Sequence, residues 1–192
     1  MTTTVTHLFD DYDRAQEAVR ALESAGFTSD EVSLASRYRD SGELADEATG
    51  AATGASVGAV AGAGTGLLTA LGVLAIPGLG PLVAAGALAT TLAGAVTGAA
   101  AGGVIGALTD YGVSEDDAHV YSEGVRRGGT LVSVRVPEER AHMATDIMNR
   151  YDPVDIEARR QSYTEGGWTR YDPNAPGYTH DEVRAERDRN RR

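Results

Sequence analysis

Histidine and acidic residues are the side chains of this sequence that could bind a metal or move a proton. The four histidines, His7, His119, His142 and His180, are far apart and lack the short spacing of a metal site. The acidic runs Asp10-Asp11 and Glu115-Asp116-Asp117 stand where helices should begin, and carboxylates there complement the helix dipole. A calcium loop needs more oxygen ligands than either run supplies. We therefore expect no metal and no catalytic residue.

Nucleotide and thiol chemistry are not indicated either. The Gly-x-Gly steps Gly62-Ala-Gly64 and Gly64-Thr-Gly66 lack the strand–turn–helix context and the following acidic residue of a dinucleotide site. The chain has no Cys, all its basic residues are Arg, and without Lys there is no phosphate-binding loop. Its net charge of −11 argues against a nucleic-acid partner, which would need basic surface. No cofactor and no small-molecule substrate is expected.

Glycine spacing is the most unusual feature of the chain. Residues 48–109 contain no charged side chain, and glycines recur there at intervals of four. Four residues advance about 400° around a helix, so these glycines form one stripe that allows two backbones to approach closely. We therefore predict helix-packing roles for Gly50, Gly54, Gly58, Gly62, Gly66, Gly86, Gly94, Gly98, Gly102 and Gly106.

A sharp turn divides this uncharged segment. Pro77, Gly78, Gly80 and Pro81 form a helix breaker between its two halves. The segment therefore reads as an antiparallel α-hairpin with arms of roughly 28 residues, or about 42 Å. Folding about Gly78 would set Gly54 beside Gly102, which favours packing within one chain.

Glycine opposes helix formation by about 1 kcal/mol per position, so something must offset the stripe. A bilayer would do so, because unsatisfied backbone groups are costly in lipid. Dense packing in a soluble oligomer would also do so. A flexible linker is a third interpretation, although linkers favour Ser and charge and rarely keep a strict period.

The flanks of this segment have the patterns of a globular α+β domain. Thr3–Phe9 and Val32–Ser36 read as strands around a helix that carries Ala15, Val19 and Leu22 on one face and ends at Gly26. Beyond the segment, Ser114 opens a helix, and Thr130–Val136 and Val154–Ala158 read as strands around another helix. Two β-α-β units predict a ferredoxin-like split β-α-β/β-α-β sandwich, interrupted by the long glycine-rich α-hairpin.

Four segments follow from this interpretation. Residues 1–45 are the first β-α-β half, 46–110 the hairpin, 111–159 a helix plus the second half, and 160–192 a polar, flexible tail. The tail is rich in Gly-Gly, Asp-Pro and Ala-Pro-Gly steps, and we expect it to add little to stability.

Several stretches resemble the bacterial general stress protein (heat-induced stress protein) family. They are Ile76-Pro-Gly-Leu-Gly-Pro-Leu-Val-Ala-Ala-Gly86, Gly112-Val-Ser-Glu-Asp-Asp-Ala118 with Tyr121, Glu123-Gly-Val-Arg-Arg-Gly-Gly-Thr-Leu-Val-Ser-Val134, and Gly26-Phe27. The resemblance covers roughly residues 3–158. It implies a stress-regulon protein that often carries an apolar glycine-rich insert and has no established catalytic activity.

The sequence therefore predicts a non-enzymatic stress-type protein whose hairpin anchors it to, or inserts it into, the cytoplasmic membrane, with membrane lipid as partner and the α+β module facing the cytoplasm. The start of the chain lacks a basic and an apolar stretch, so no signal peptide is expected. The alternative is a soluble, cytoplasmic homo-oligomer whose hairpins share a core. A third hypothesis is a small-molecule-sensing domain with weak catalysis.

Overall fold

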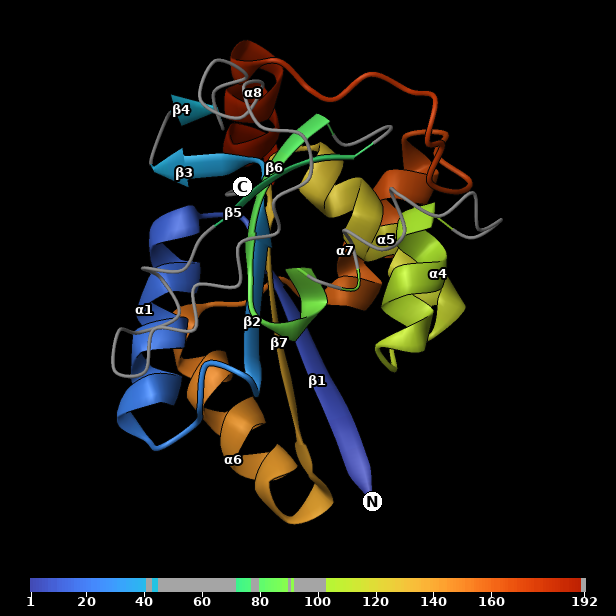
Figure 1. The fold of residues 1–192 in the computed structure, drawn as a ribbon. Coiled ribbons are helices and arrows are strands. Elements are labelled where there is room, and N and C mark those ends of the chain that lie inside the picture. The colour runs from blue at the N-terminus through green and yellow to red at the C-terminus, as the bar shows by residue number, and fades with distance from the viewer. Residues whose placement is uncertain (41–42, 45–71, 77–79, 90, 92–102, 191–192) are drawn as a thin grey trace.

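A computed structural model gives the fold of residues 1–40, 43–44, 72–76, 80–89, 91 and 103–190. These residues form an α+β structure with one main antiparallel sheet (Figure 1). The helices are α1 (Tyr12–Ser24), α4 (Gly103–Asp110), α5 (Glu115–Arg126), α6 (Glu138–Met148), α7 (Ile156–Glu165) and α8 (His180–Asn190), with a 3-10 turn η2 (Asn149–Tyr151). The strands are β1 (Thr2–Phe9), β2 (Val32–Ser36), β3 (Tyr38–Asp40), β4 (Glu43–Leu44), β5 (Gly72–Ile76), β6 (Gly80–Ala85) and β7 (Thr130–Pro137).

The main sheet has the order β1-β7-β2-β6-β5, and β3 and β4 form a separate pair. Strand β7 lies between β1 and β2 and is antiparallel to both, with Val5 opposite Val134 and Ser33 opposite Ser133. The predicted strands at residues 3–9, 32–36 and 130–136 are therefore confirmed, and they share one sheet. Strand β6 extends this sheet beyond β2, so part of the uncharged segment belongs to the same body as its flanks.

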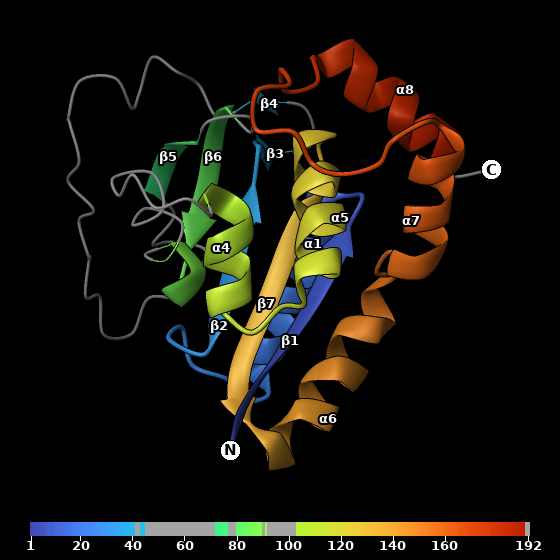
Figure 2. The same cartoon turned by 90° about the vertical axis from the view of Figure 1, so that its right-hand side faces the viewer.

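Helices cover both faces of the sheet. Helices α1 and α6 lie on one face and α4, α5 and α7 on the other, while α8 lies beyond one end of the sheet (Figure 1 and Figure 2). On α1, Ala15, Val19 and Leu22 are fully buried, as their spacing predicts. The helix ends before Gly26, whose φ of +88° is a left-handed conformation that glycine adopts without strain. At α5, the Ser114 side chain accepts a hydrogen bond from the Asp117 backbone N–H, which confirms the predicted cap.

The predicted fourth strand, Val154–Ala158, is wrong. Asp155 accepts hydrogen bonds from the backbone N–H groups of Glu157 and Ala158 and so caps α7, which begins at Ile156. One bond remains of the expected pairing: the Val154 N–H donates to the Leu8 carbonyl at 2.7 Å. The capping carboxylate decides in favour of helix, although Val154, Ile156 and Ala158 alternate as a strand would.

The predicted α-hairpin is wrong around its centre, whereas residues 103–110 at the end of its second arm are helical as predicted. Residues 72–76 and 80–85 pair as antiparallel strands, with Ile76 opposite Gly80. Leu82, Ala84 and Ala85 are buried because β6 pairs with β2 inside the sheet. The aliphatic residues of this stretch therefore satisfy their backbone groups in a ladder and not in a helix.

This result corrects the prediction of a membrane-inserted hairpin. Among the residues that the structure describes, no helix is both long and apolar enough to span a bilayer.

The C-terminal segment is packed, contrary to the prediction of a flexible tail. It contributes the end of α7 and all of α8, and Tyr163, Tyr171 and Val183 are at most 4% exposed. Their apolar rings and methyl groups offset the polar composition on which the prediction relied.

Candidate interaction site

The predicted hairpin residues do not come together in the described structure. Gly50 to Gly66, Gly94 to Gly102, Pro77 and Gly78 lie outside the described residues. Gly80 and Pro81 lie within β6 and not in a turn. Gly86 follows β6 with a φ of +81°, and a side chain there would collide with the Val32 backbone, so its role is a close strand contact and not helix packing. Gly106 is on α4, and no described atom lies within 4 Å of a Cβ placed there.

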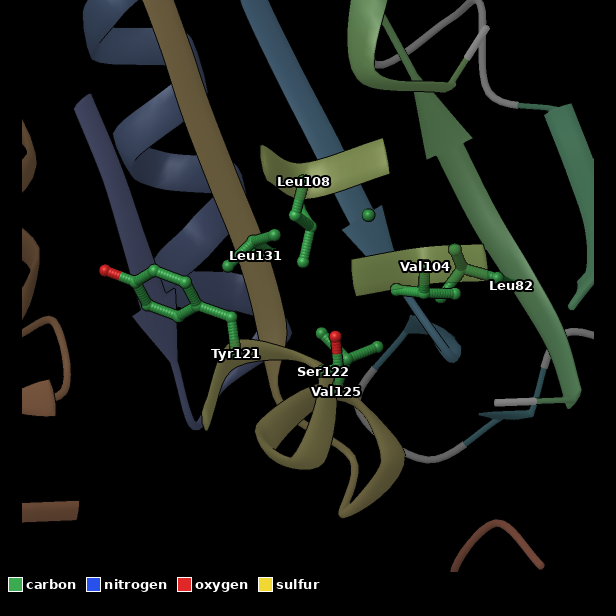
Figure 3. Close-up of a pocket in the computed structure, with 8 residues that line it drawn as sticks. Leu82, Val104, Leu108, Tyr121, Ser122, Val125 and Leu131 are labelled. Carbon is green, nitrogen blue, oxygen red and sulfur yellow. The ribbon is translucent and has the colours of Figure 1, made fainter. Parts of the chain in front are cut away.

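A small apolar cavity of about 10 Å³ lies between the sheet and helices α4 and α5 (Figure 3). It has room for about one water molecule. The Ser122 hydroxyl lies on its wall and is fully buried, and it has no hydrogen-bond partner among the described residues. The other lining residues are Ala35, Leu82, Val104, Leu108, Tyr121, Val125 and Leu131. With one polar group and this volume, the cavity does not fit a metabolite.

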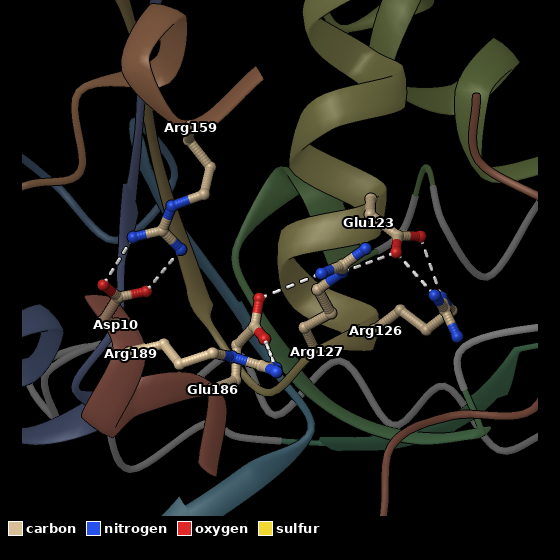
Figure 4. Close-up of polar contacts among 7 residues, drawn as sticks. All are labelled: Asp10, Glu123, Arg126, Arg127, Arg159, Glu186 and Arg189. Carbon is tan, nitrogen blue, oxygen red and sulfur yellow. Dashed lines mark hydrogen bonds and ion pairs between the residues drawn. The ribbon is translucent and has the colours of Figure 1, made fainter. Parts of the chain in front are cut away.

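A charged cluster fills the other end of this face (Figure 4). Glu123 on α5 is 1% exposed, and its carboxylate binds Arg126 at 2.5 Å and Arg127 at 2.6 Å. Arg127 also binds Glu186 of α8 at 3.0 Å, and Glu186 pairs with Arg189. The cluster therefore joins α5 to α8 across 59 residues of sequence.

Arg159 of α7 makes a second polar connection, to the end of β1. Its guanidinium donates two hydrogen bonds to the Asp10 carboxylate, at 2.6 and 2.8 Å (Figure 4). Burial acts to lower the pKa of Arg159, but the Asp10 carboxylate outweighs it and the net shift is upward. Such bidentate pairs hold their partners in a defined orientation.

Arg37, just after β2, fastens the segment between α7 and α8. It donates to the Arg126 carbonyl at the C-terminus of α5 and to the Tyr178 carbonyl, at 2.9 and 3.0 Å. A Cβ at Gly177 would lie 2.5 Å from this guanidinium, so a side chain at this position would displace the end of Arg37. Tyr178 itself contacts the Arg126 guanidinium, 5.0 Å from the ring centre.

Tyrosines surround these arginines and stay protonated. Burial raises the pKa of Tyr163 and of Tyr171 to about 12, despite nearby guanidinium groups that act to lower it. Burial likewise raises the pKa of Tyr121 to about 12. These hydroxyls therefore serve as neutral donors or packing groups and not as bases near neutral pH.

The four histidines lie on four different elements, β1, α5, α6 and α8. In the residues that the structure describes, no three His, Asp or Glu side chains converge as metal ligands would. Burial lowers the pKa of His7 and, together with Arg170, that of His119. His119 shares a hydrogen bond with Arg170 at 3.1 Å.

In the described structure, the outer edge of β1 has unpaired backbone groups over part of its length. The Leu8 carbonyl accepts a hydrogen bond from Val154 and so points away from β7. Because the direction alternates along a strand, the even-numbered residues of β1 direct their backbone N–H and C=O groups outward, while those of the odd-numbered residues bond to β7. Tyr121 donates to the outward carbonyl of Thr6 at 2.9 Å. Within the described part of the chain, the outward groups of Thr2 and Thr4 have no partner. Strand β1 is thus capped at its C-terminal end and open over residues 2–5.

The sequence reasoning missed both the charged cluster and the open edge. Glu123 is spaced from Arg126 and Arg127 as in the i,i+3 and i,i+4 pairs of a helix. These two ion pairs could therefore have been predicted from the sequence. Glu186 and Asp10 find their partners through the tertiary fold, which no local pattern reveals.

The chain was compared with models of protein families, with curated proteins and with solved structures, and nothing in any of the three comparisons matches it.

Proposed function

We propose that this chain is a non-enzymatic, stress-type protein that acts by associating with further copies of itself. This is the homo-oligomeric alternative of the sequence analysis, with the α+β body as the unit of assembly. The stress assignment rests on the resemblance of residues 3–158 to the general stress proteins and on nothing else.

The observation that carries the proposal is the character of the two outer strands. Among the strands that the structure describes, the sheet ends in β1 on one side and β5 on the other, and neither strand contains Asp, Glu or Arg. Proteins that must avoid edge-to-edge association usually protect such strands with charges, Pro or bulges. Strand β1 has none of these over its eight residues, in a chain with a net charge of −11.

A second observation supports the same proposal. Strands β1, β7 and β2, with α1 and α6 on one face, correspond to a ferredoxin-like unit whose fourth strand is missing. That fourth strand would pair with the outer edge of β1. Residues 154–158 instead begin α7, so the edge keeps its capacity to accept a strand.

Sedimentation velocity on the full chain tests this proposal over a concentration range of roughly a hundredfold. We expect a dimer or larger species whose population rises with concentration. A monomer at every concentration would contradict self-association. The control is the same series in about 2 M urea: reversible loss of the larger species without aggregation distinguishes specific association from precipitation.

A further inference from the structure

We infer that the partner of the open β1 edge is the β1 strand of a second copy, paired antiparallel about a twofold axis through Thr3. This inference rests on the proposed self-association and specifies its surface and register. It is argued from which backbone groups are free, from the charge of the strand and from the exposure of Met1.

The free backbone groups select the register. A pairing centred on Thr3 places Thr2 opposite Thr4 of the second copy, and the reverse, so that four N–H···O=C bonds use only groups that are unoccupied in the described structure. A pairing centred on Thr4 would instead need the Thr6 carbonyl, which already accepts from Tyr121. The antiparallel direction is also the one that the missing fourth strand would have.

Charge favours a second copy over an unrelated segment. A chain with a net charge of −11 repels its copies over most of its surface. Residues 1–6 carry no acidic or basic side chain, so the paired parts of two β1 strands can approach with no like-charged side chains opposite each other. Threonine and valine in this stretch also have side chains that suit paired strands.

Exposure of Met1 gives the third argument. Met1 and Met143 are the large apolar side chains that remain exposed among the described residues, and Met1 is fully exposed. In the Thr3-centred register, Met1 lies opposite Val5 of the second copy. Val5 packs on the core under α1 and α6, so pairing would cover Met1 at the margin of that core.

Single cysteines test the register directly, because the chain has no cysteine of its own. In this pairing the two Thr3 residues face each other in a non-hydrogen-bonded pair, with Cα atoms about 4.5 Å apart. That separation permits a disulfide, whereas the two Thr2 residues lie more than about 7 Å apart, which does not. The experiment compares T3C with T2C in the full-length protein, at equal concentration and under mild oxidation with glutathione disulfide.

We expect T3C to form a covalent dimer at least about tenfold faster than T2C, and folded T3C dimer to keep the circular dichroism of the wild type. Equal rates for the two variants, or a faster T2C, would overturn the register. If neither variant cross-links while the wild type still sediments as an oligomer, the β1 pairing is wrong and self-association through another surface stands. If the wild type is monomeric and neither cross-links, both proposals fail.

A charge exchange supplies a second test that does not depend on oxidation. T3K alone and T3E alone should each shift the sedimentation equilibrium toward monomer, because two like charges would meet at the twofold axis. An equimolar mixture should recover the dimer. Q161K, which adds a charge at an exposed position of α7, should leave association unchanged. Failure of the mixture to associate while each variant stays folded would contradict the pairing of residue 3 with itself.

Discussion

The two faces of the sheet are built from different interactions. Under α1 and α6 the buried residues are mainly apolar, with Phe9, Leu22 and Met148 among the largest, and the buried hydroxyls of Ser36 and Thr130 bond to each other. Under α5 and the C-terminal helices an apolar cluster adjoins buried charges, of which Glu123 is the most enclosed. The first face depends on the hydrophobic effect, and the second also depends on geometry that keeps each charge paired.

This difference shows how the C-terminal segment is held. An apolar face tolerates modest rearrangement, because dispersion contacts are individually weak. A buried carboxylate shared by two guanidinium groups does not, because losing one partner leaves a charge without compensation. The α5 face is therefore the more specific of the two, and three measurements can break or sharpen the comparison.

The largest effect is expected at Glu123. Replacing it with Ala leaves Arg126 and Arg127 without their shared carboxylate and should lower the free energy of unfolding by about 3–5 kcal/mol. The control on the other face is Leu22→Ala, with an expected cost of about 2–5 kcal/mol from lost burial and a cavity. Urea titrations of both variants and of Glu123→Gln separate the causes, because Gln keeps the size of the Glu123 side chain and removes its charge. Glu123→Gln should retain most of the cost of Glu123→Ala; a Glu123→Gln variant as stable as the wild type would erase the distinction between the faces.

Removal of residues 168–192 should have an intermediate effect. The truncation exposes the surface now covered by Tyr171 and Val183 and deprives Arg127 of Glu186. The entropy regained by the released segment offsets part of this loss. We expect a net loss of about 2 kcal/mol, or roughly 4–8 °C in Tm for a chain of this size, measured by calorimetry. An unchanged Tm would restore the original prediction of a loose tail.

The smallest effect is expected at Ser122, and it should be favourable. Its hydroxyl is buried against an apolar cavity without a partner, so Ser122→Ala should raise the free energy of unfolding by about 0.5–1 kcal/mol. The matched control is Ser33→Ala, because the Ser33 hydroxyl bonds to Tyr111 at 3.0 Å and accepts from the Leu88 N–H at 3.1 Å. That variant should lose about 1–2 kcal/mol. Two losses of equal size would mean that Ser122 has a partner.

Sequence patterns predicted the elements in which one periodicity dominates. The alternation of Thr130–Val136 and the spacing of Ala15, Val19 and Leu22 have one structural solution each, and both were confirmed. Val154, Ile156 and Ala158 fit a strand as well as the start of a helix, and the Asp155 cap decided between them. In the uncharged segment the glycine period of four predicted helix. The aliphatic run that ends at Ile76 was the better signal there, because it forms a strand.

The candidate site was less predictable than the fold for a physical reason. An edge strand is defined by the absence of a neighbour, and this property depends on where every other strand goes. The pairing of Arg159 with Asp10 joins residues 149 apart, and the sequence contains many other Arg and acidic residues that are chemically equivalent partners. Only the tertiary fold selects one of them.

The position of β7 between β1 and β2 has a consequence for how the protein is made. Thr6 meets Ser133 across the ladder, 127 residues later in the chain. At a synthesis rate of roughly 5–20 residues per second, β1 leaves the ribosome about 6–25 s before its neighbour exists. The N-terminal strand, which is rich in β-branched residues, therefore stays unpaired while the rest of the sheet is translated. During that interval another nascent chain carries the same unpaired strand, so the rate of translation and the crowding of ribosomes on one message control how many chains meet before they fold.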